Sequence, residues 1–351
     1  MKQFQWPESG SVRLRCNNIW QETPDCISFT LTSKDQASTF QFIPGQFVTL
    51  GVEIDGSLVH RAYSLSSLPN QTEMQFTVKR VTDGLVSNYL NHHLQIGQEV
   101  EVLQPAGQFH IEQPHNNKVL LLSAGCGITP VMSMARTLLA DKRDQTDIHF
   151  IHAATCAEQI IYHSELLDMK KQHQRFKLDI MLEDATDTEY MEGRLTQATL
   201  ENYCPDIRQR SAFLCGPVAF MQSMKEYLDA LGMDMTQFYQ ESFTPSEPPQ
   251  PDNAYSASKA DALAQATVFV PSFGTQTQIS TGSLLIDALE SAKVPVIAAC
   301  RSGICGSCKC KVTKGEITRT STEALTEQEI ADGFVLACSC QIHSDIEVSL
   351  S

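Results

Sequence analysis

Residues 300–310, CRSGICGSCKC, place four cysteines within eleven positions, and residues 337–340, ACSC, add two more. Six thiols exceed what one tetrahedral ion or one small cluster requires. Two glycines and two serines within the first stretch allow a tight loop that aims backbone N–H groups at sulfur. The stretch therefore predicts a metal or cluster site that uses some of these thiols.

The spacing of the cysteines selects the ligands. Cys300, Cys305 and Cys308 follow C-x4-C-x2-C, and Cys338 comes thirty residues later, as in plant-type [2Fe-2S] proteins. A structural zinc site, the alternative, usually combines two close pairs of ligands on separate hairpins. We therefore predict that these four cysteines bind a [2Fe-2S] cluster.

The two remaining thiols each lie two positions beyond a predicted ligand. Cys310 and Cys340 would sit about 6 to 7 Å further along an extended strand, which is too far to reach the same iron. We predict that both are small core residues.

The composition restricts the class of protein. The chain has 351 residues, a formal charge of -15 and 42% apolar residues, with no basic run, which argues against nucleic-acid binding. The first ten residues lack the apolar core of a secretion signal, and the apolar runs are too short to span a bilayer. We expect a cytoplasmic protein without a membrane segment, in which twelve cysteines stay reduced.

Four prolines in residues 245–251 mark a linker. Before it, short alternating runs predict an antiparallel β-barrel, and from Lys118 onwards strands alternate with helical stretches, as in a parallel α/β sheet. The predicted domains are a barrel at 1–114, an α/β domain at 115–243, a linker at 244–264 and a cysteine-containing domain at 265–351.

Two motifs in the first two domains suggest ligand sites. Arg61, Tyr63 and Ser64 combine a cation, an aromatic ring and a hydroxyl, which suits a flat ligand with an anionic end, although an ordinary exposed barrel edge remains an alternative. Gly125 and Gly127 follow a strand and open a helix, which suits a phosphate group. A Gly-x-Gly pair alone is often only a tight turn.

Together these motifs resemble the ferredoxin-NADP reductase superfamily over essentially the whole chain. The matching segments are Arg-x-Tyr-Ser at 61–64, Gly-Cys-Gly-Ile-Thr-Pro at 125–130 and Leu-Cys-Gly-Pro at 214–217. Within it, the chain resembles the NADH oxidoreductases of hybrid-cluster proteins. This resemblance implies an FAD-binding antiparallel β-barrel, an NAD-binding α/β domain with a parallel sheet and a C-terminal α+β ferredoxin domain with a β-grasp fold.

The resemblance also implies roles for residues in the barrel. Arg61 would pair with the pyrophosphate, Tyr63 would pack on the isoalloxazine, and Ser64 would hydrogen-bond near the reactive flavin nitrogen. Further cofactor contacts are implied for Lys79, Gly84 and Ser87. FAD is favoured over FMN, which some related reductases use.

In the α/β domain the resemblance implies a nicotinamide-nucleotide site. The implied contacts are Gly125, Gly127, Thr129, Gly216 and Pro217, while Phe243 would reach the flavin. Cys215 would either shape hydride transfer or serve as a small buried residue. Residues 152–158 contain no Arg or Lys and one carboxylate, which favours NADH over NADPH.

The implied activity is NADH oxidation with electron transfer through FAD and the [2Fe-2S] cluster to a partner protein. The first expected partner is a hybrid-cluster protein that reduces hydroxylamine or nitric oxide. A ring-hydroxylating or demethylating oxygenase is the second. A non-catalytic electron-transfer subunit or redox sensor is an alternative of another class.

Overall fold

The computed structural model describes residues 2–7, 10–141, 145–243, 265–298, 301, 303, 306–322 and 324–350. The predicted linker at 244–264 and two predicted cluster ligands, Cys300 and Cys305, lie outside these residues. The chain divides into two compact units, residues 1–59 with 63–244 and residues 245–351 with 60–62. None of the helices formed by the described residues combines the length and apolar character that a membrane span requires.

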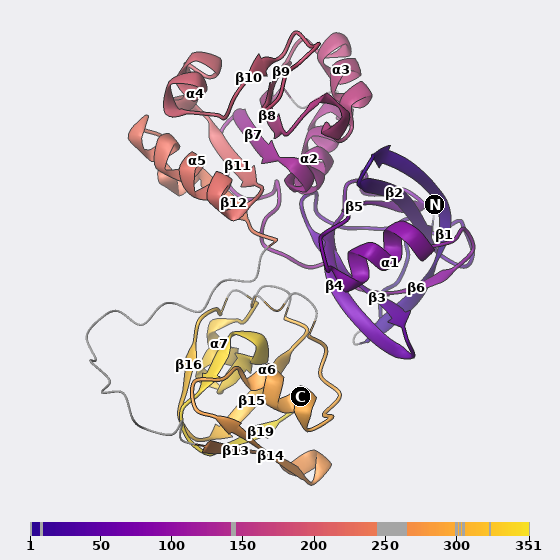
Figure 1. The fold of residues 1–351 in the computed structure, drawn as a ribbon, viewed down its shortest axis with the longest axis vertical. Coiled ribbons are helices and arrows are strands. Elements are labelled where there is room, and N and C mark those ends of the chain that lie inside the picture. The colour runs from indigo at the N-terminus through magenta and orange to yellow at the C-terminus, as the bar shows by residue number, and fades with distance from the viewer. Residues whose placement is uncertain are drawn as a thin grey trace. The chain divides into compact units, whose positions relative to one another are not determined.

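The first domain is an antiparallel β-barrel whose six strands follow the order β4-β3-β6-β1-β2-β5 (Figure 1). Alternate side chains on these strands face a core that includes Phe29, Leu50 and Phe76. One helix lies beside the barrel, directly after the strand β5. The elements are β1 (Ser11–Thr23), β2 (Cys26–Thr32), β3 (Phe47–Ile54), β4 (Ser57–Ser64), β5 (Glu73–Lys79), α1 (Leu85–His93) and β6 (Glu99–Leu103).

The second domain is a parallel sheet of six strands in the order β10-β9-β8-β7-β11-β12. Its elements are β7 (Lys118–Ala124), α2 (Ile128–Ala140), β8 (Asp147–Ala154), α3 (His163–Gln172), β9 (Phe176–Leu182), β10 (Met191–Glu192), α4 (Gln197–Tyr203), β11 (Ser211–Cys215), α5 (Val218–Ala230) and β12 (Phe238–Glu241). Short 3-10 helices lie at Gly125–Gly127, Ala157–Gln159, Ile207–Gln209 and Met235–Gln237.

Strand β7 shows why this sheet carries helices on both faces (Figure 1). Val119 and Leu121 belong to the core formed with α2 and α3, whereas Leu120 and Leu122 belong to the core formed with α4 and α5. Successive side chains of a strand point to opposite faces, so a continuous apolar run serves two cores. The predicted α/β architecture is confirmed.

The C-terminal domain has a five-stranded mixed sheet in the order β14-β13-β19-β15-β17 and a two-stranded sheet, β16-β18. Helix α6 packs Leu285 and Leu289 into a core that also contains Cys310 and Cys340. The elements are β13 (Gln265–Val270), β14 (Thr275–Ser280), α6 (Leu285–Ser291), β15 (Lys309–Lys314), β16 (Ile317–Arg319), α7 (Glu327–Ala331), β17 (Phe334–Leu336), β18 (Cys340–Ile342) and β19 (Ile346–Ser349), with 3-10 helices at Pro271–Phe273 and Ala337–Ser339.

Candidate functional site

The Arg-x-Tyr-Ser motif lies at the end of strand β4. Arg61 and Tyr63 are half-buried and, two positions apart, share one face of the strand, while Ser64 lies on the other. Ser64 is only 5% exposed, and its buried hydroxyl has no hydrogen-bond partner among the described residues. Since a buried hydroxyl without a partner is costly, this atom is suited to meet a polar group of a bound ligand.

The segment from β5 to α1 contains the other predicted flavin contacts. Lys79 forms an ion pair with Asp25 at 3.2 Å, so its ammonium already has one protein partner. Burial raises the pKa of Asp25, but hydrogen bonds from Thr23 and the charge of Lys79 outweigh it and leave that pKa below its ordinary value. Gly84 caps α1, and a Cβ there would meet the Ser87 hydroxyl at 2.5 Å. The first turn of α1 carries no acidic residue and leaves its positive dipole end available for an anion.

The Gly-x-Gly loop joins β7 to α2. Gly125 has φ +50° and open space around its Cα, so the backbone there is left-handed and accessible to a ligand. Gly127 is buried, and a Cβ there would overlap the backbone carbonyl of Cys215. Thr129 is 2% exposed and donates its hydroxyl to the Cys126 carbonyl at 3.1 Å, which closes the first turn of α2. Glycine is therefore favoured at position 125 by the left-handed backbone and at position 127 by the lack of space for a Cβ.

The Leu-Cys-Gly-Pro motif ends β11 beside that loop. Cys215 is completely buried, and burial, together with the nearby Glu241 and Cys126, raises the pKa of its thiol well above the ordinary value. Gly216 is buried, and a Cβ there would overlap the Phe220 ring at 2.8 Å. Pro217 caps α5 and is exposed. The tertiary structure thus brings two motifs, 90 residues apart in sequence, to one edge of the sheet.

Strand β12 ends at the same edge. Glu241 pairs in register with Cys215 on the neighbouring strand and is only 7% exposed. Glu241 has no role among the predicted contacts, although a carboxylate at the end of a strand in a parallel sheet indicates a ligand site. Phe243, two residues further, is 48% exposed.

Carboxylates lie where the strands β8 and β9 end. Glu158 is exposed in the 3-10 helix after β8, and the exposed Asp184 donates its backbone N–H to the Thr155 carbonyl at 2.8 Å. Hydrogen bonds from its own backbone N–H and from the Cys156 thiol lower the pKa of Glu158. A negative charge at this edge disfavours a nucleotide with an additional phosphate.

In the C-terminal domain, two predicted cluster ligands are among the described residues. The Sγ atoms of Cys308 and Cys338 are 3.3 Å apart, close enough for both to bind one metal ion. The backbone N–H of Gly303 donates to the Cys338 Sγ at 3.2 Å, and the N–H of Cys338 donates to the Cys308 Sγ at 3.5 Å. Paired thiols surrounded by N–H donors fit an anionic iron–sulfur cluster. Cys310 and Cys340 are fully buried.

Three parts of the chain match described protein families. Residues 14–111 match the oxidoreductase FAD-binding domain, residues 121–226 the oxidoreductase NAD-binding domain, and residues 270–343 the 2Fe-2S iron-sulfur cluster binding domain. The chain therefore binds FAD, NADH and a [2Fe-2S] cluster, as the sequence predicted.

Similar proteins cover nearly the whole chain. The glycine betaine monooxygenase reductase subunit of Chromohalobacter salexigens is 36% identical and aligns over 97% of this chain and 95% of its own length. NADH oxidoreductase HCR of Escherichia coli strain K12 is 35% identical, over 95% of this chain and 96% of its own. The solved structure of phthalate dioxygenase reductase, 23% identical, covers 97% of this chain and 98% of its own with a TM-score of 0.64, which supports the fold.

These relatives are oxidoreductases, which favours the predicted enzyme over a non-catalytic subunit. The three matched domains account for the predicted route from NADH through FAD to the [2Fe-2S] cluster. The chain belongs to the ferredoxin-NADP reductase superfamily, among the NADH-dependent flavoprotein reductases that carry a C-terminal [2Fe-2S] ferredoxin domain.

Proposed function

We propose that this reductase delivers electrons from NADH to a hybrid-cluster protein that reduces hydroxylamine or nitric oxide. The observation that carries the proposal is the match with NADH oxidoreductase HCR across 95% of this chain. We also place the protein in the cytoplasm, where NADH is available and its twelve cysteines stay reduced.

A second candidate function is the supply of electrons to an oxygenase. It is favoured by the 36% identity with the glycine betaine monooxygenase reductase subunit, which extends over a similar share of the chain. The surface that recognises a partner lies outside the cofactor motifs, so these motifs are compatible with both partners.

The proposed residue roles rest on the family resemblance of the motifs. In this proposal Arg61, Tyr63 and Ser64 hold the flavin, with Ser64 offering its buried hydroxyl to the ring. The remaining flavin contacts are Lys79, Gly84, Ser87 and Phe243. The nucleotide contacts are Gly125, Gly127, Thr129, Gly216 and Pro217. The cluster ligands are Cys300, Cys305, Cys308 and Cys338.

Bound FAD would supply two-electron chemistry and a bound cluster one-electron chemistry, so a route from NADH to a one-electron acceptor would require both groups. Cys215 remains a neutral thiol because of its raised pKa, and it supports the nucleotide loop through its carbonyl position against Gly127. The N–H groups of Gly303 and Cys338 offset negative charge on the ligand sulfurs.

The partner is tested by reconstitution. The purified chain, loaded with FAD and cluster, is mixed with NADH and either a hybrid-cluster protein plus hydroxylamine or the oxygenase component of glycine betaine monooxygenase plus its substrate. We expect NADH consumption to depend on the hybrid-cluster protein and to be slower with the oxygenase. Faster turnover with the oxygenase would replace the first proposal by the second.

Nucleotide preference gives a separate prediction. Replacing Glu158 by lysine should raise the ratio of kcat/KM for NADPH over NADH about fivefold, because a charge that repels the additional phosphate is replaced by one that attracts it. The matched control is Glu201→Lys on α4, which makes the same charge change on an exposed helix position. An equal shift in both variants would show that net charge, rather than position, controls the preference.

The core thiol of Cys310 leads to another prediction. Cys310→Ala should retain the visible absorption spectrum of the cluster, because the side chain is fully buried in the core shared with α6. Iron and sulfide content per chain should also stay unchanged. Loss of the spectrum in folded protein would assign Cys310 to the cluster site.

A further inference from the structure

A set of polar contacts joins the barrel to the α/β domain through residues that no predicted cofactor role uses. We name Tyr162, Arg136 and Ser133 the clamp residues. All three belong to the α/β domain, and each bonds to the barrel or to the segment that follows the flavin motif. Together they bridge the two domains within one compact unit of the chain.

Tyr162 is bound to the barrel through both its side chain and its backbone. Its hydroxyl lies 2.5 Å from Oγ1 of Thr77 on β5, and its backbone N–H donates to the Glu22 carboxylate at 3.1 Å. The residue is 4% exposed and has a φ of +59°, a left-handed conformation that a bulky side chain adopts rarely. Such a conformation persists only where the surrounding structure imposes it.

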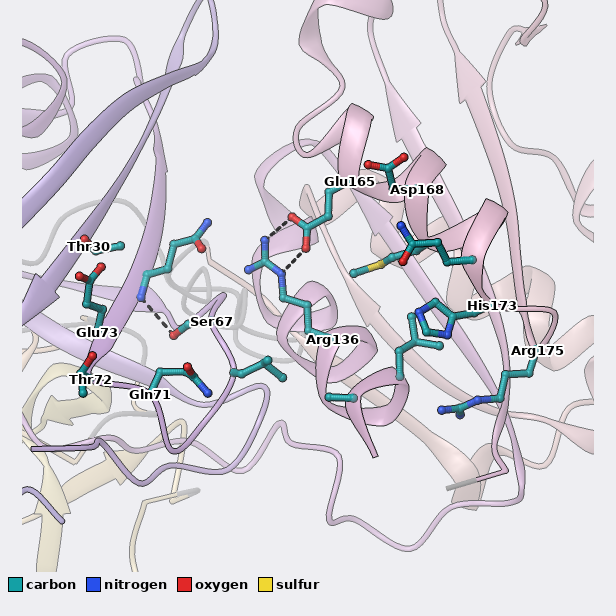
Figure 2. Close-up of a pocket in the computed structure, with 16 residues that line it drawn as sticks. Thr30, Ser67, Gln71, Thr72, Glu73, Arg136, Glu165, Asp168, His173 and Arg175 are labelled. Atoms are coloured by element: carbon teal, nitrogen blue, oxygen red, sulfur yellow. Dashed lines mark hydrogen bonds and ion pairs between the residues drawn. The ribbon is translucent and has the colours of Figure 1, made fainter. Parts of the chain in front are cut away.

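Arg136 reaches the barrel from helix α2. Its Nε and Nη2 atoms donate to the two carboxylate oxygens of Glu165 on α3 at 2.8 and 2.6 Å, and Nη1 donates to the Ser66 carbonyl. The guanidinium also lies over the Tyr162 ring, 4.9 Å from its centroid. Figure 2 shows the paired Arg136 and Glu165 facing the barrel segment that contains Ser67.

Ser133 adds the third contact. It is completely buried one turn before Arg136 on α2, and its hydroxyl donates to the Ser67 carbonyl at 2.7 Å. The two adjacent carbonyls, those of Ser66 and Ser67, therefore each accept a hydrogen bond from the same helix.

Beside the clamp, the space between the domains is open. A cavity of about 1120 Å³ is lined by Ser67, Gln71 and Glu73 from the barrel side and by Arg136, Glu165 and other residues of α2 and α3 from the other (Figure 2). Its lining includes none of the predicted cofactor residues. The polar contacts of the clamp residues therefore lie at the border of this cavity, beside the apolar core that includes Tyr162 and Cys26.

The clamp residues and their partners lie close along the chain to both predicted ligand motifs. Ser66 and Ser67 follow Ser64 by two and three residues, and helix α2 begins directly after Gly127. Thr77 also accepts, at its carbonyl, a hydrogen bond from the thiol of Cys126 in the Gly-x-Gly loop at 3.6 Å. A shift at the clamp would therefore move the flavin-side strands relative to the nucleotide loop.

We propose that Tyr162 and Arg136 are positioning residues for hydride transfer, because they set the separation between the nucleotide loop and the strands that carry the flavin motif. The proposal rests on the flavin and nicotinamide residues proposed above and is independent of which partner accepts the electrons. Hydride transfer is sensitive to such a separation, since a misplacement of about 1 Å can cost about 100-fold in rate.

The test uses the full chain loaded with FAD and cluster, in the variants Tyr162→Phe and Arg136→Lys. Phenylalanine removes only the hydroxyl, and Thr77 keeps a partner in the Ser28 hydroxyl at 2.5 Å. Lysine keeps the charge of Arg136 but not its planar fork. The matched control is Tyr190→Phe, which removes a hydroxyl bonded to His163 at 2.6 Å within the α/β domain alone.

Anaerobic rapid mixing with NADH gives the rate constant of flavin bleaching per bound FAD and the Kd for NADH. We expect each clamp variant to lower the rate constant about tenfold with an unchanged Kd for NADH. The loss of a single contact should displace the two motifs by less than about 1 Å, so the effect should be smaller than about 100-fold. Hydrogen exchange of the loaded chain should increase both in residues 65–67 and in the first turns of α2. The Tyr190→Phe control should change none of these quantities.

Two outcomes would overturn the proposal. One is an unchanged rate constant in both clamp variants. The other is a loss of rate that is matched by an equal weakening of NADH binding, because that would place the defect in the nucleotide site itself. Since flavin bleaching needs no acceptor protein, failure of the partner proposal would leave these measurements unchanged.

Discussion

Cys338→Ala is expected to remove the [2Fe-2S] cluster from an otherwise folded chain and to abolish electron delivery to any protein partner. Cys338 is proposed as the remote ligand, and its Sγ lies 3.3 Å from that of Cys308. Loss of a residue that only supports a metal ligand already costs about 10- to 100-fold in affinity, so loss of a ligand should cost more. Visible absorption and iron content measure the cluster directly.

The control for this variant lies two residues away. Cys340→Ala makes the same substitution at a fully buried thiol in the same core, and it should keep the cluster. In both variants, reduction of ferricyanide by NADH should continue, since FAD lies in another domain. Equal loss of iron in the two variants would contradict the ligand assignment.

Gly127→Ala is expected to produce the second large effect, a loss of flavin reduction by NADH. The added Cβ would overlap the carbonyl of Cys215 and the N atom of Gly216, and backbone atoms cannot rotate away as a side chain does. The start of α2 and the end of β11 must then separate. Such overpacking costs about 2 to 3 kcal/mol of unfolding free energy, and the displaced nucleotide loop should slow flavin reduction about 100-fold.

Gly125→Ala separates this packing effect from backbone conformation. Gly125 has a positive φ but no atom within 4 Å of an added Cβ, so alanine there should cost only about 1 to 2 kcal/mol of backbone strain. Urea unfolding and anaerobic flavin reduction measure the two variants side by side. A larger loss of rate in Gly125→Ala would mean that close contact with the bound nucleotide, rather than packing against Cys215, dominates at this loop.

The parts that were predicted from sequence share a physical property: their chemistry is encoded over short spacings. The C-x4-C-x2-C run, the Arg-x-Tyr-Ser run and the Gly-x-Gly loop each carry their signal in residues that are neighbours in the sequence. Hydrophobic alternation and the switch to strand–helix repeats predicted the barrel and the parallel sheet for the same reason. The family matches confirm the resulting fold and cofactors.

What the sequence left open depends on residues that are distant along the chain. The sequence indicates that Gly127 is a phosphate-loop glycine, and in the structure it also allows α2 to approach Cys215 on β11. Glu241 became part of the site only because β12 pairs with β11 in parallel register. Neither contact has a sequence signal of its own, because strand order is set by tertiary packing.

By itself, then, the sequence determined the domain types, the cofactors and the donor atoms, since these follow from residue type and short spacing. Only the tertiary structure decided how the barrel is held against the α/β domain. Tyr162 in the α/β domain contacts Thr77 of the barrel, which is 85 residues away in the sequence. Arg136 of the same domain contacts Ser66 on the barrel side, 70 residues away. Such contacts join residues that are distant along the chain, so no local sequence pattern predicts them.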